Sequence, residues 1–151
     1  MQSKAAKRLY HEFAREMPII DYHNHLSPQQ IAENRPLINI GEVWLSGDHY
    51  KWREIRANGI DEKYISGNAS PRKKFDKWAE TVPYTVKNPL FHWSHLELKR
   101  HFNIDRFLQP STASAIYQSA NEVLNSTRPQ DILKAMKVEV ICTIKTTVVV
   151  S

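Results

Sequence analysis

The sequence predicts an α/β fold that is mostly helical and contains two short strands. Two apolar runs rich in β-branched residues, PIIDYH (18–23) and VEVICT (138–143), are typical of buried strands. The residues between them, 24–137, carry helix caps, proline starts and apolar side chains at spacings of three and four. A helical insertion of this length indicates an elaborated first strand-to-helix connection of a larger enzyme.

Length and composition set limits on the class of protein. A chain of 151 residues is one domain or part of one. A closed (β/α)8 barrel needs ~200–250 residues, so the chain can hold only part of such a fold. Its 41% hydrophobic and 25% charged residues exclude a disordered tail. The net charge of +5, with both signs mixed along the chain, permits an anionic ligand and does not call for nucleic acid.

Cysteine content and apolar runs bear on the compartment. The single cysteine excludes a disulfide framework and a cysteine-based zinc cluster. The N-terminus has no apolar core of a signal peptide, and no run approaches the ~20 apolar residues of a membrane span. We therefore expect a cytoplasmic protein that does not cross a membrane.

The first predicted element is a helix over residues 4–16. Strong helix formers fill this segment, and Ala5, Leu9 and Phe13 form one apolar stripe along it. Pro18 ends the helix, because the residue before a proline is pushed out of the α region. The first strand follows directly.

Capping residues predict the other helices. Ser, Asp or Asn stands before most of them, with proline at several first helical positions and glycine or proline at the ends. The predicted segments are 28–34, 39–45, 46–60, 61–67, 70–82, 88–102, 111–126 and 128–137. The large aromatic residues at helical spacing are most simply core residues: Trp44, Trp52, Trp78, Phe91 and Trp93. The last residues, 144–151, form a β-prone tail of the kind that pairs with other chains, unless a sheet ties it down.

The sharpest chemical feature is the pair His23 and His25 at the end of the first predicted strand. Residues two apart in a strand face the same side, so the two imidazoles converge on one point. Neutral imidazole is a common ligand of zinc, and this end of a barrel strand is where active sites lie. A polar loop with two chance histidines is the alternative. A catalytic zinc usually has three protein ligands, so one must come from elsewhere. Asp21 either lines the same face or, more simply, hydrogen-bonds at the strand end.

A second polar cluster lies in the segment GDHYKWR. Asp48 is explained as a helix cap without any further function. His49 and Tyr50 could act as acid–base or hydrogen-bonding groups if they face a pocket. Lys51 and Arg53 could bind a carboxylate, which Arg does in bidentate fashion. The alternative, favoured by composition, is a solvated helix face.

A third group follows at His92 and His95, which share a helix face, with Glu97 and Arg100 nearby. These residues could support a site, but a satisfied core or interface histidine is the simpler interpretation. No glycine-rich phosphate loop, Gly-x-Ser-x-Gly motif or nucleic-acid signature is present. Cys142 falls in a predicted buried strand, which argues against a nucleophile.

Three motifs, DYHNHLSP, GDHYKWR and NPLFHWSHLELKR, stand in an order and spacing that resemble the N-terminal part of uronate (glucuronate) isomerases, in the amidohydrolase superfamily. The resemblance covers roughly residues 4–143. It implies a distorted (β/α)8 TIM barrel with a helical insertion, here about 27–137. This chain would hold the barrel's N-terminal portion, mostly helical with two short parallel strands.

The resemblance also implies an activity and a site. Family members interconvert D-glucuronate with D-fructuronate, and D-galacturonate with D-tagaturonate, through an enediol, and carry one divalent metal, usually zinc. The family's metal-binding pair corresponds to His23 and His25. Its histidine–tyrosine pair in the substrate pocket corresponds to His49 and Tyr50, with Tyr50 as the group that shuttles the proton. Asn24 stands where the family often has cysteine.

The chain departs from the family after Thr143, where IKTTVVVS replaces the family's TDDP and the rest of the barrel. The catalytic aspartate and the arginines of the family's later strands have no counterpart here. We therefore expect a truncated chain, homo-oligomeric like many enzymes of its class, that is inactive alone. Two alternatives stay open: a non-catalytic helical module that self-associates, and a hydrolase of the same superfamily.

Overall fold

The computed structural model describes residues 2–143 and 147–149, which divide into two compact units. The strand unit comprises the described parts of residues 1–35 and 128–151, and the helical unit comprises residues 36–127. Each unit is described by itself. Within the described residues, no helix is both long and apolar enough to cross a membrane.

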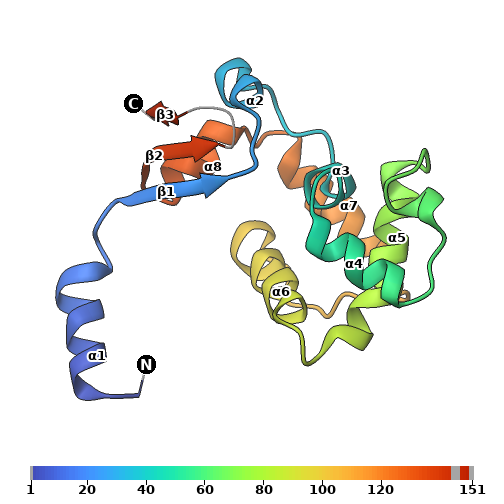
Figure 1. The fold of residues 1–151 in the computed structure, drawn as a ribbon, viewed down its shortest axis with the longest axis horizontal. Coiled ribbons are helices and arrows are strands. Elements are labelled where there is room, and N and C mark those ends of the chain that lie inside the picture. The colour runs from blue at the N-terminus through green and yellow to red at the C-terminus, as the bar shows by residue number, and fades with distance from the viewer. Residues whose placement is uncertain (1, 144–146, 150–151) are drawn as a thin grey trace. The chain divides into compact units, whose positions relative to one another are not determined.

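The strand unit contains a three-stranded sheet in the order β1-β2-β3 (Figure 1). The strands are β1 (Ile19–Asn24), β2 (Val138–Thr143) and β3 (Thr147–Val149). The first two are parallel, with Ile19 opposite Val138, and β3 runs antiparallel to β2. The two short parallel strands expected from the sequence are thus confirmed. The part of the expected tail at 147–149 is tied into the sheet, and the rest of 144–151 lies outside the described residues.

The two parallel strands differ in burial. β2 is buried as expected, with Ile141 fully enclosed, and its neighbours in a small core are Ile31, Leu133 and Val138. The expectation of a buried first strand is wrong, because Ile20 is 65% and Tyr22 86% exposed. The reason is position: within the described residues β1 pairs only with β2 and forms an edge of the sheet. Apolar composition predicts a strand but not what covers it.

The N-terminal segment is helical, as predicted, but changes type along its length. An α-helical start, α1 (Lys4–Arg8), leads into a π-helical stretch, η1 (Leu9–Ala14), whose end is marked by the Arg15 N–H donating to the Tyr10 carbonyl at 2.8 Å. The predicted apolar stripe stays exposed, at 63% for Leu9 and 60% for Phe13.

The strand unit also contains two short helices that are far apart in the sequence but linked by hydrogen bonds: α2 (Pro28–Glu33) and α8 (Pro129–Ala135). α2 ends at Asn34, whose left-handed backbone (φ 46°) turns the chain away. Gln130 then donates from its backbone N–H to Asn34 Oδ1 at 3.1 Å and from its side chain to the Ile31 carbonyl at 2.9 Å. These bonds link segments about a hundred residues apart.

The helical unit contains five α-helices with short 3-10 turns between them. They are α3 (Ile40–Leu45), α4 (His49–Ala57), η2 (Glu62–Tyr64), α5 (Pro71–Thr81), η3 (Val82–Thr85), α6 (Pro89–Phe102) and α7 (Ala113–Leu124). The caps predicted these elements well: Asp48, Ser70 and Asn88 each accept a hydrogen bond from a first-turn N–H.

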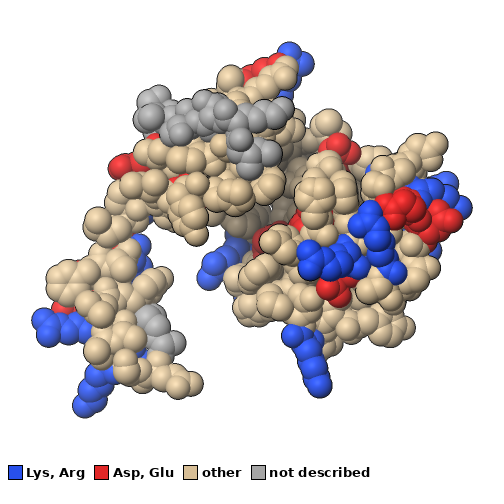
Figure 2. All heavy atoms as spheres, in the orientation of Figure 1, with Lys and Arg blue, Asp and Glu red and all other residues tan. Residues whose placement is uncertain are grey.

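The helical unit has a continuous core in which α3, α5 and α7 pack together (Figure 1). Phe75 and Trp78 of α5 are fully buried at its centre. Gly41 permits α3 to approach the start of α5 closely, since a Cβ at position 41 would lie 2.4 Å from the Pro71 carbonyl oxygen. On the face of the helical unit that Figure 2 shows, acidic and basic side chains lie side by side rather than in one patch of a single sign.

Candidate functional site

The first group of candidate residues lies at the carboxyl end of β1. His23 belongs to the strand and His25 follows its last residue. Their ring centroids are 5.1 Å apart, with the ring planes at 89°. Both side chains are exposed. The two imidazoles therefore lie next to each other on an open surface of the strand unit.

Asp21 holds the backbone at this point. One carboxylate oxygen accepts from the His23 backbone N–H at 3.3 Å, and the other accepts from Asn24 Nδ2 at 2.7 Å. Asn24 in turn accepts from the Leu26 N–H at 2.6 Å. Asp21 is thus the strand-end hydrogen-bonding group that the simpler interpretation expected, and it supports the turn that carries both histidines.

The imidazole pair has the chemistry of a partial metal site. Neutral imidazole nitrogens are good ligands for zinc and other divalent transition metals. Within residues 2–143 and 147–149, however, no group of three or more His, Cys, Asp or Glu side chains comes together. The strand unit can therefore supply two ligands, and a closed site needs donors beyond these.

The start of α4 is organised by Asp48. Its Oδ1 accepts from the backbone N–H groups of Tyr50 (2.9 Å) and Lys51 (3.0 Å), and its Oδ2 accepts from Lys51 Nζ at 2.6 Å. Burial alone would raise the pKa of Asp48, but the hydrogen bonds and charge of Lys51 outweigh it and lower the pKa below its ordinary value. The expected cap is confirmed.

Lys51 corrects one expectation. It is neither solvated nor open to a ligand carboxylate, because only 6% of the residue is exposed. The Lys51 ammonium donates to Asp48 and also lies 5.5 Å from the centre of the Trp44 ring. The helix turns this position inward while Tyr50 and Arg53 are exposed, which the mostly polar sequence could not reveal.

Glu97 of α6 lies near the same buried lysine. Burial raises the pKa of the Glu97 carboxyl above its ordinary value, against the smaller lowering effects of the Lys51 and His101 charges. This residue belongs to the interior of the helical unit rather than to a separate site with His92.

The other predicted residues of α4 face outward. The His49 ring packs edge-on against Trp52, with 4.8 Å between the ring centroids. Tyr50 is 66% exposed, and the Arg53 guanidinium carbon lies 5.5 Å from the centre of its ring. These three side chains are therefore available to a ligand.

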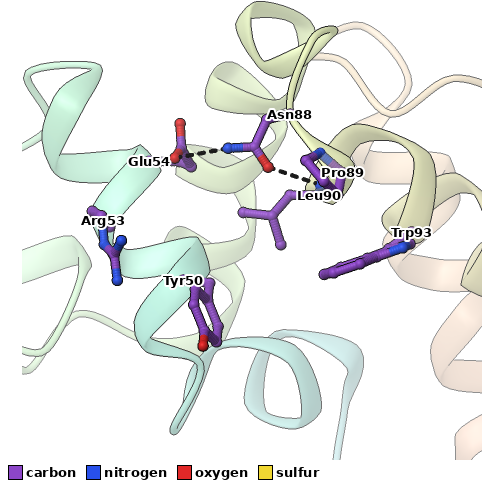
Figure 3. A pocket seen from close by; sticks show the side chains of 7 residues that line it. All are labelled: Tyr50, Arg53, Glu54, Asn88, Pro89, Leu90 and Trp93. Carbon is purple, nitrogen blue, oxygen red and sulfur yellow. Dashed lines mark hydrogen bonds between the residues drawn. The ribbon is translucent and has the colours of Figure 1, made fainter.

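Two of them, Tyr50 and Arg53, line a pocket of about 380 Å³ between α4 and the start of α6 (Figure 3). The full set of lining residues is Tyr50, Arg53, Glu54, Asn88, Pro89, Leu90 and Trp93. Across the pocket, Asn88 Nδ2 donates to Glu54 Oε1 at 3.0 Å. Sequence reasoning brought Tyr50 and Arg53 forward but missed Glu54, and it treated Asn88 only as a helix cap and the first residue of the motif NPLFHWSHLELKR.

Trp93 was expected in the core and is instead 53% exposed at the edge of this pocket. The buried positions of α6 are Leu90, Ser94 and Leu98, four residues apart, and position 93 falls off that stripe.

His95 confirms the simpler interpretation of the third group. Its Nε2 accepts from the Leu108 backbone N–H at 2.9 Å, and its Nδ1 lies 2.6 Å from the Phe91 carbonyl oxygen, to which it donates. Burial lowers the pKa of His95, and the Phe91 hydrogen bond only partly offsets that. His92 is exposed.

A family model and curated proteins that match the chain indicate the same family. The family model of glucuronate isomerase matches residues 1–148. Curated proteins named uronate isomerase from Shouchella clausii and Caldicellulosiruptor saccharolyticus are 54% and 52% identical to the chain, over 145 and 143 residues. Each match covers 95% of this chain but only 31% of the relative. The chain therefore spans about a third of the length of these relatives.

Two solved structures also match most of the chain. The crystal structure of uronate isomerase from Thermotoga maritima matches with a TM-score of 0.86 and 40% identity, over 95% of this chain and 32% of that one. Glucuronate isomerase from Caulobacter crescentus matches with a TM-score of 0.78 over 85% of this chain and 29% of that one. At 22% identity, the second likeness concerns the fold alone.

Proposed function

The chain belongs to the glucuronate isomerase family, and on that premise we propose that it forms part of an aldose–ketose isomerase of hexuronates. The reactions are the interconversion of D-glucuronate with D-fructuronate and of D-galacturonate with D-tagaturonate. The proposal includes a distorted (β/α)8 barrel, of which the strand unit would provide the first two strands. The cytoplasmic location and homo-oligomeric state expected from the sequence belong to the same proposal.

The observation that carries this proposal is the His23–His25 pair at 5.1 Å, at the carboxyl end of β1. Barrel enzymes build their active sites at this end of their strands. Two neighbouring, exposed imidazoles are a donor set that fits a divalent metal such as zinc. When bound, such a metal stabilises negative charge on sugar oxygens as a Lewis acid. We assign its remaining ligand to protein outside this chain.

The reaction moves protons and leaves the carbon skeleton intact. The proton on C2 of the aldose passes to C1, and the hydroxyl proton on the C2 oxygen passes to the C1 oxygen. Tyr50 is the group we assign to the carbon-to-carbon transfer, because its phenol can give and accept a proton. His49 would hydrogen-bond a sugar hydroxyl, and Arg53 would bind the substrate carboxylate in bidentate fashion.

The proposal makes this chain one part of the catalytic apparatus. On its own it would supply two metal ligands and one side of the substrate site, so we expect no turnover of D-glucuronate by the isolated chain. Measured turnover by the purified 151-residue chain would contradict this.

A chimera tests the function directly. Residues 1–143 would replace the matching segment of the 54% identical Shouchella clausii relative, and D-glucuronate isomerisation would be assayed. We expect activity in the chimera and its loss on combining His23→Ala with His25→Ala. An inactive but folded chimera would overturn the proposal.

Zinc titration of the chain by calorimetry separates an inherited metal pair from a non-catalytic helical module. We expect weak 1:1 binding that the same double substitution removes. The matched control, His92→Ala combined with His101→Ala, removes two exposed histidines of the helical unit and should leave binding unchanged. Zinc binding that survives the loss of His23 and His25 would favour the module.

A further inference from the structure

Lys51 carries a buried charge in the first turn of α4. Among the residues that the structure describes, it is the one charged side chain that is buried, with 6% of the residue exposed. A lysine loses favourable hydration when it is enclosed, so a buried ammonium is rare without a partner. A role that needs the ammonium at this place would account for the cost of burying it.

Lys51 is joined to the backbone of the first turn through Asp48. Its Nζ donates to Asp48 Oδ2 at 2.6 Å, while Asp48 Oδ1 accepts from the backbone N–H groups of Tyr50 and Lys51. The ammonium therefore holds the carboxylate in the orientation that binds the Tyr50 N–H. Capping alone needs only an oxygen acceptor, which asparagine or serine also supplies. The buried lysine is thus additional to the cap.

The Lys51 ammonium also contacts the preceding helix, α3. It lies 5.5 Å from the centre of the Trp44 ring, and only 5% of Trp44 is exposed. A cation over a desolvated aromatic ring is attracted to the face of that ring. This contact favours a Lys51 side chain that points into the helical unit rather than toward solvent.

Glu97 adds a second carboxyl to this cluster, from α6. Burial raises the pKa of Glu97 above its ordinary value, the Lys51 and His101 charges lower it, and the Asp48 charge raises it. Glu97 therefore lies close enough to Lys51 and Asp48 to interact with both of them. The cluster joins α4 to α6, which the hydrogen bond from Asn88 to Glu54 also does.

The members of the cluster come from two of the sequence motifs. Asp48 and Lys51 belong to GDHYKWR, and Glu97 belongs to NPLFHWSHLELKR. The proposed function assigns roles to the outward-facing residues of the first motif and to none of these three. A common cluster gives the two motifs one structural purpose.

We propose that Lys51 and Glu97 are positioning residues that act through Asp48 to fix the first turn of α4, and with it the place of the Tyr50 side chain. Lys51 is buried, so it acts on the reaction only through its neighbours. The inference rests on the proposed function for the role of Tyr50. Loss of the buried charge should therefore slow the proton transfer more than it weakens substrate binding.

Amide hydrogen exchange of the 151-residue chain tests the positioning without any measurement of activity. Lys51→Met keeps an unbranched side chain and removes the ammonium. We expect exchange of the Tyr50 N–H to become about tenfold faster, because the Asp48 carboxylate loses the group that orients it. Lys77→Met is the matched control, since it breaks another ion pair three positions apart, between Lys77 Nζ and Glu80 at 2.7 Å in α5. Equal exchange at Tyr50 in the two variants would overturn the proposal.

A double variant separates the charged cluster from the cap. Asp48→Asn combined with Lys51→Met retains an acceptor for the Tyr50 N–H and removes both charges of the pair, so the chain should fold, as circular dichroism would establish. We expect exchange of the Tyr50 N–H to stay faster than in the unchanged chain. Exchange as slow as in the unchanged chain would show that capping alone holds the turn, and would overturn the proposal.

The role of Glu97 is tested by its charge. Glu97→Gln should accelerate exchange of the Tyr50 N–H less than Lys51→Met does, and Glu122→Gln, at an exposed position of α7, should not change it. In a carbon NMR titration, Lys51→Met should raise the pKa of Glu97, because the Lys51 charge lowers it. An unchanged Glu97 pKa, or equal effects of the two glutamine variants, would overturn the assignment of Glu97.

Kinetics of the chimera with the Shouchella clausii relative separate this inference from the proposed function. Lys51→Met should lower kcat for D-glucuronate about tenfold and leave KM unchanged, because it displaces Tyr50 and retains Arg53. Lys77→Met should leave both constants unchanged. An active chimera whose kcat does not respond to Lys51→Met would overturn this inference alone. An inactive unsubstituted chimera would overturn the proposed function, and exchange at Tyr50 in the 151-residue chain would still decide the positioning role.

Discussion

The helical unit and the strand unit bury their apolar residues very differently. In the helical unit Phe75 is fully enclosed in a core that runs through five helices. In the strand unit Phe13 is 60% exposed, and among the residues that the structure describes the buried cluster has four members. The same residue type thus has opposite surroundings in the two units.

Because of this difference, the candidate residues of the two units are supported by different amounts of buried packing. The helical unit carries its own core, and the helices that line the pocket of Tyr50 and Trp93 pack on that core. The strand unit carries the His23–His25 pair on β1, which lies at the edge of the sheet within the described residues and has exposed apolar side chains. Site residues on the two units should therefore respond differently to loss of packing.

The largest expected effect is in the core of the helical unit. Phe75→Ala should lower the free energy of unfolding by about 3–5 kcal/mol, because it leaves a cavity among closely packed side chains. Urea unfolding followed by tryptophan fluorescence measures it. The matched change Phe13→Ala should cost no more than about 0.5 kcal/mol. Similar costs for the two would remove the contrast between the units.

A smaller loss is expected in the strand unit. Ile141→Ala should cost about 2 kcal/mol, the low end for a buried isoleucine, since a core of four residues can collapse around the gap. Hydrogen exchange of the β1 and β2 amides reports it. Ile20→Ala, at a 65% exposed position of the neighbouring strand, serves as the control and should leave exchange unchanged.

The next effect concerns the support of the pocket. Asp48→Ala should cost about 1–2 kcal/mol, because it removes the cap of α4 and the partner of the buried Lys51. The indole N–H of Trp93 should shift as α4 loosens. Asp61→Ala, which removes the cap of the short exposed turn η2, should have a smaller effect on unfolding and leave Trp93 in place. Equal effects would show that the Lys51 pair adds nothing.

The smallest effect is a pH dependence at His95. Its pKa is lower in the folded protein than in the unfolded chain, so the unfolded state binds more protons as the pH falls. The stability that His95 contributes is therefore complete above about pH 6.5, the ordinary histidine value, and is lost as the pH falls below it. Thermal unfolding from pH 7.5 to 5 should show a decline that His95→Gln reduces. His11→Gln, at an exposed position of η1, should keep the full decline.

Local signals in the sequence predicted most of the helices and the two strands, whereas the parallel pairing of those strands was implied by the family resemblance. Asp48, Ser70 and Asn88 begin their helices where the caps indicated, because capping depends on hydrogen bonds within one turn. The same holds for His23 and His25, which lie close together because they are two positions apart at the end of a strand.

Burial could not be predicted in this way. Lys51 proved buried, and Ile20 and Trp93 exposed, because burial depends on which distant segment covers a face. The pocket likewise joins Glu54 to Asn88, 34 positions apart, by a hydrogen bond that no local pattern encodes.

The amino-acid order by itself thus determined where most of the helices lie, the two strands, the imidazole pair and the family. Each follows from interactions or patterns that span a few residues. Only the tertiary structure decided which lysine is enclosed, which tryptophan is open and where a ligand-sized cavity lies. These three features depend on packing between segments far apart in the chain. The free energy of burial arises only when those segments come together, so no single stretch of sequence contains it.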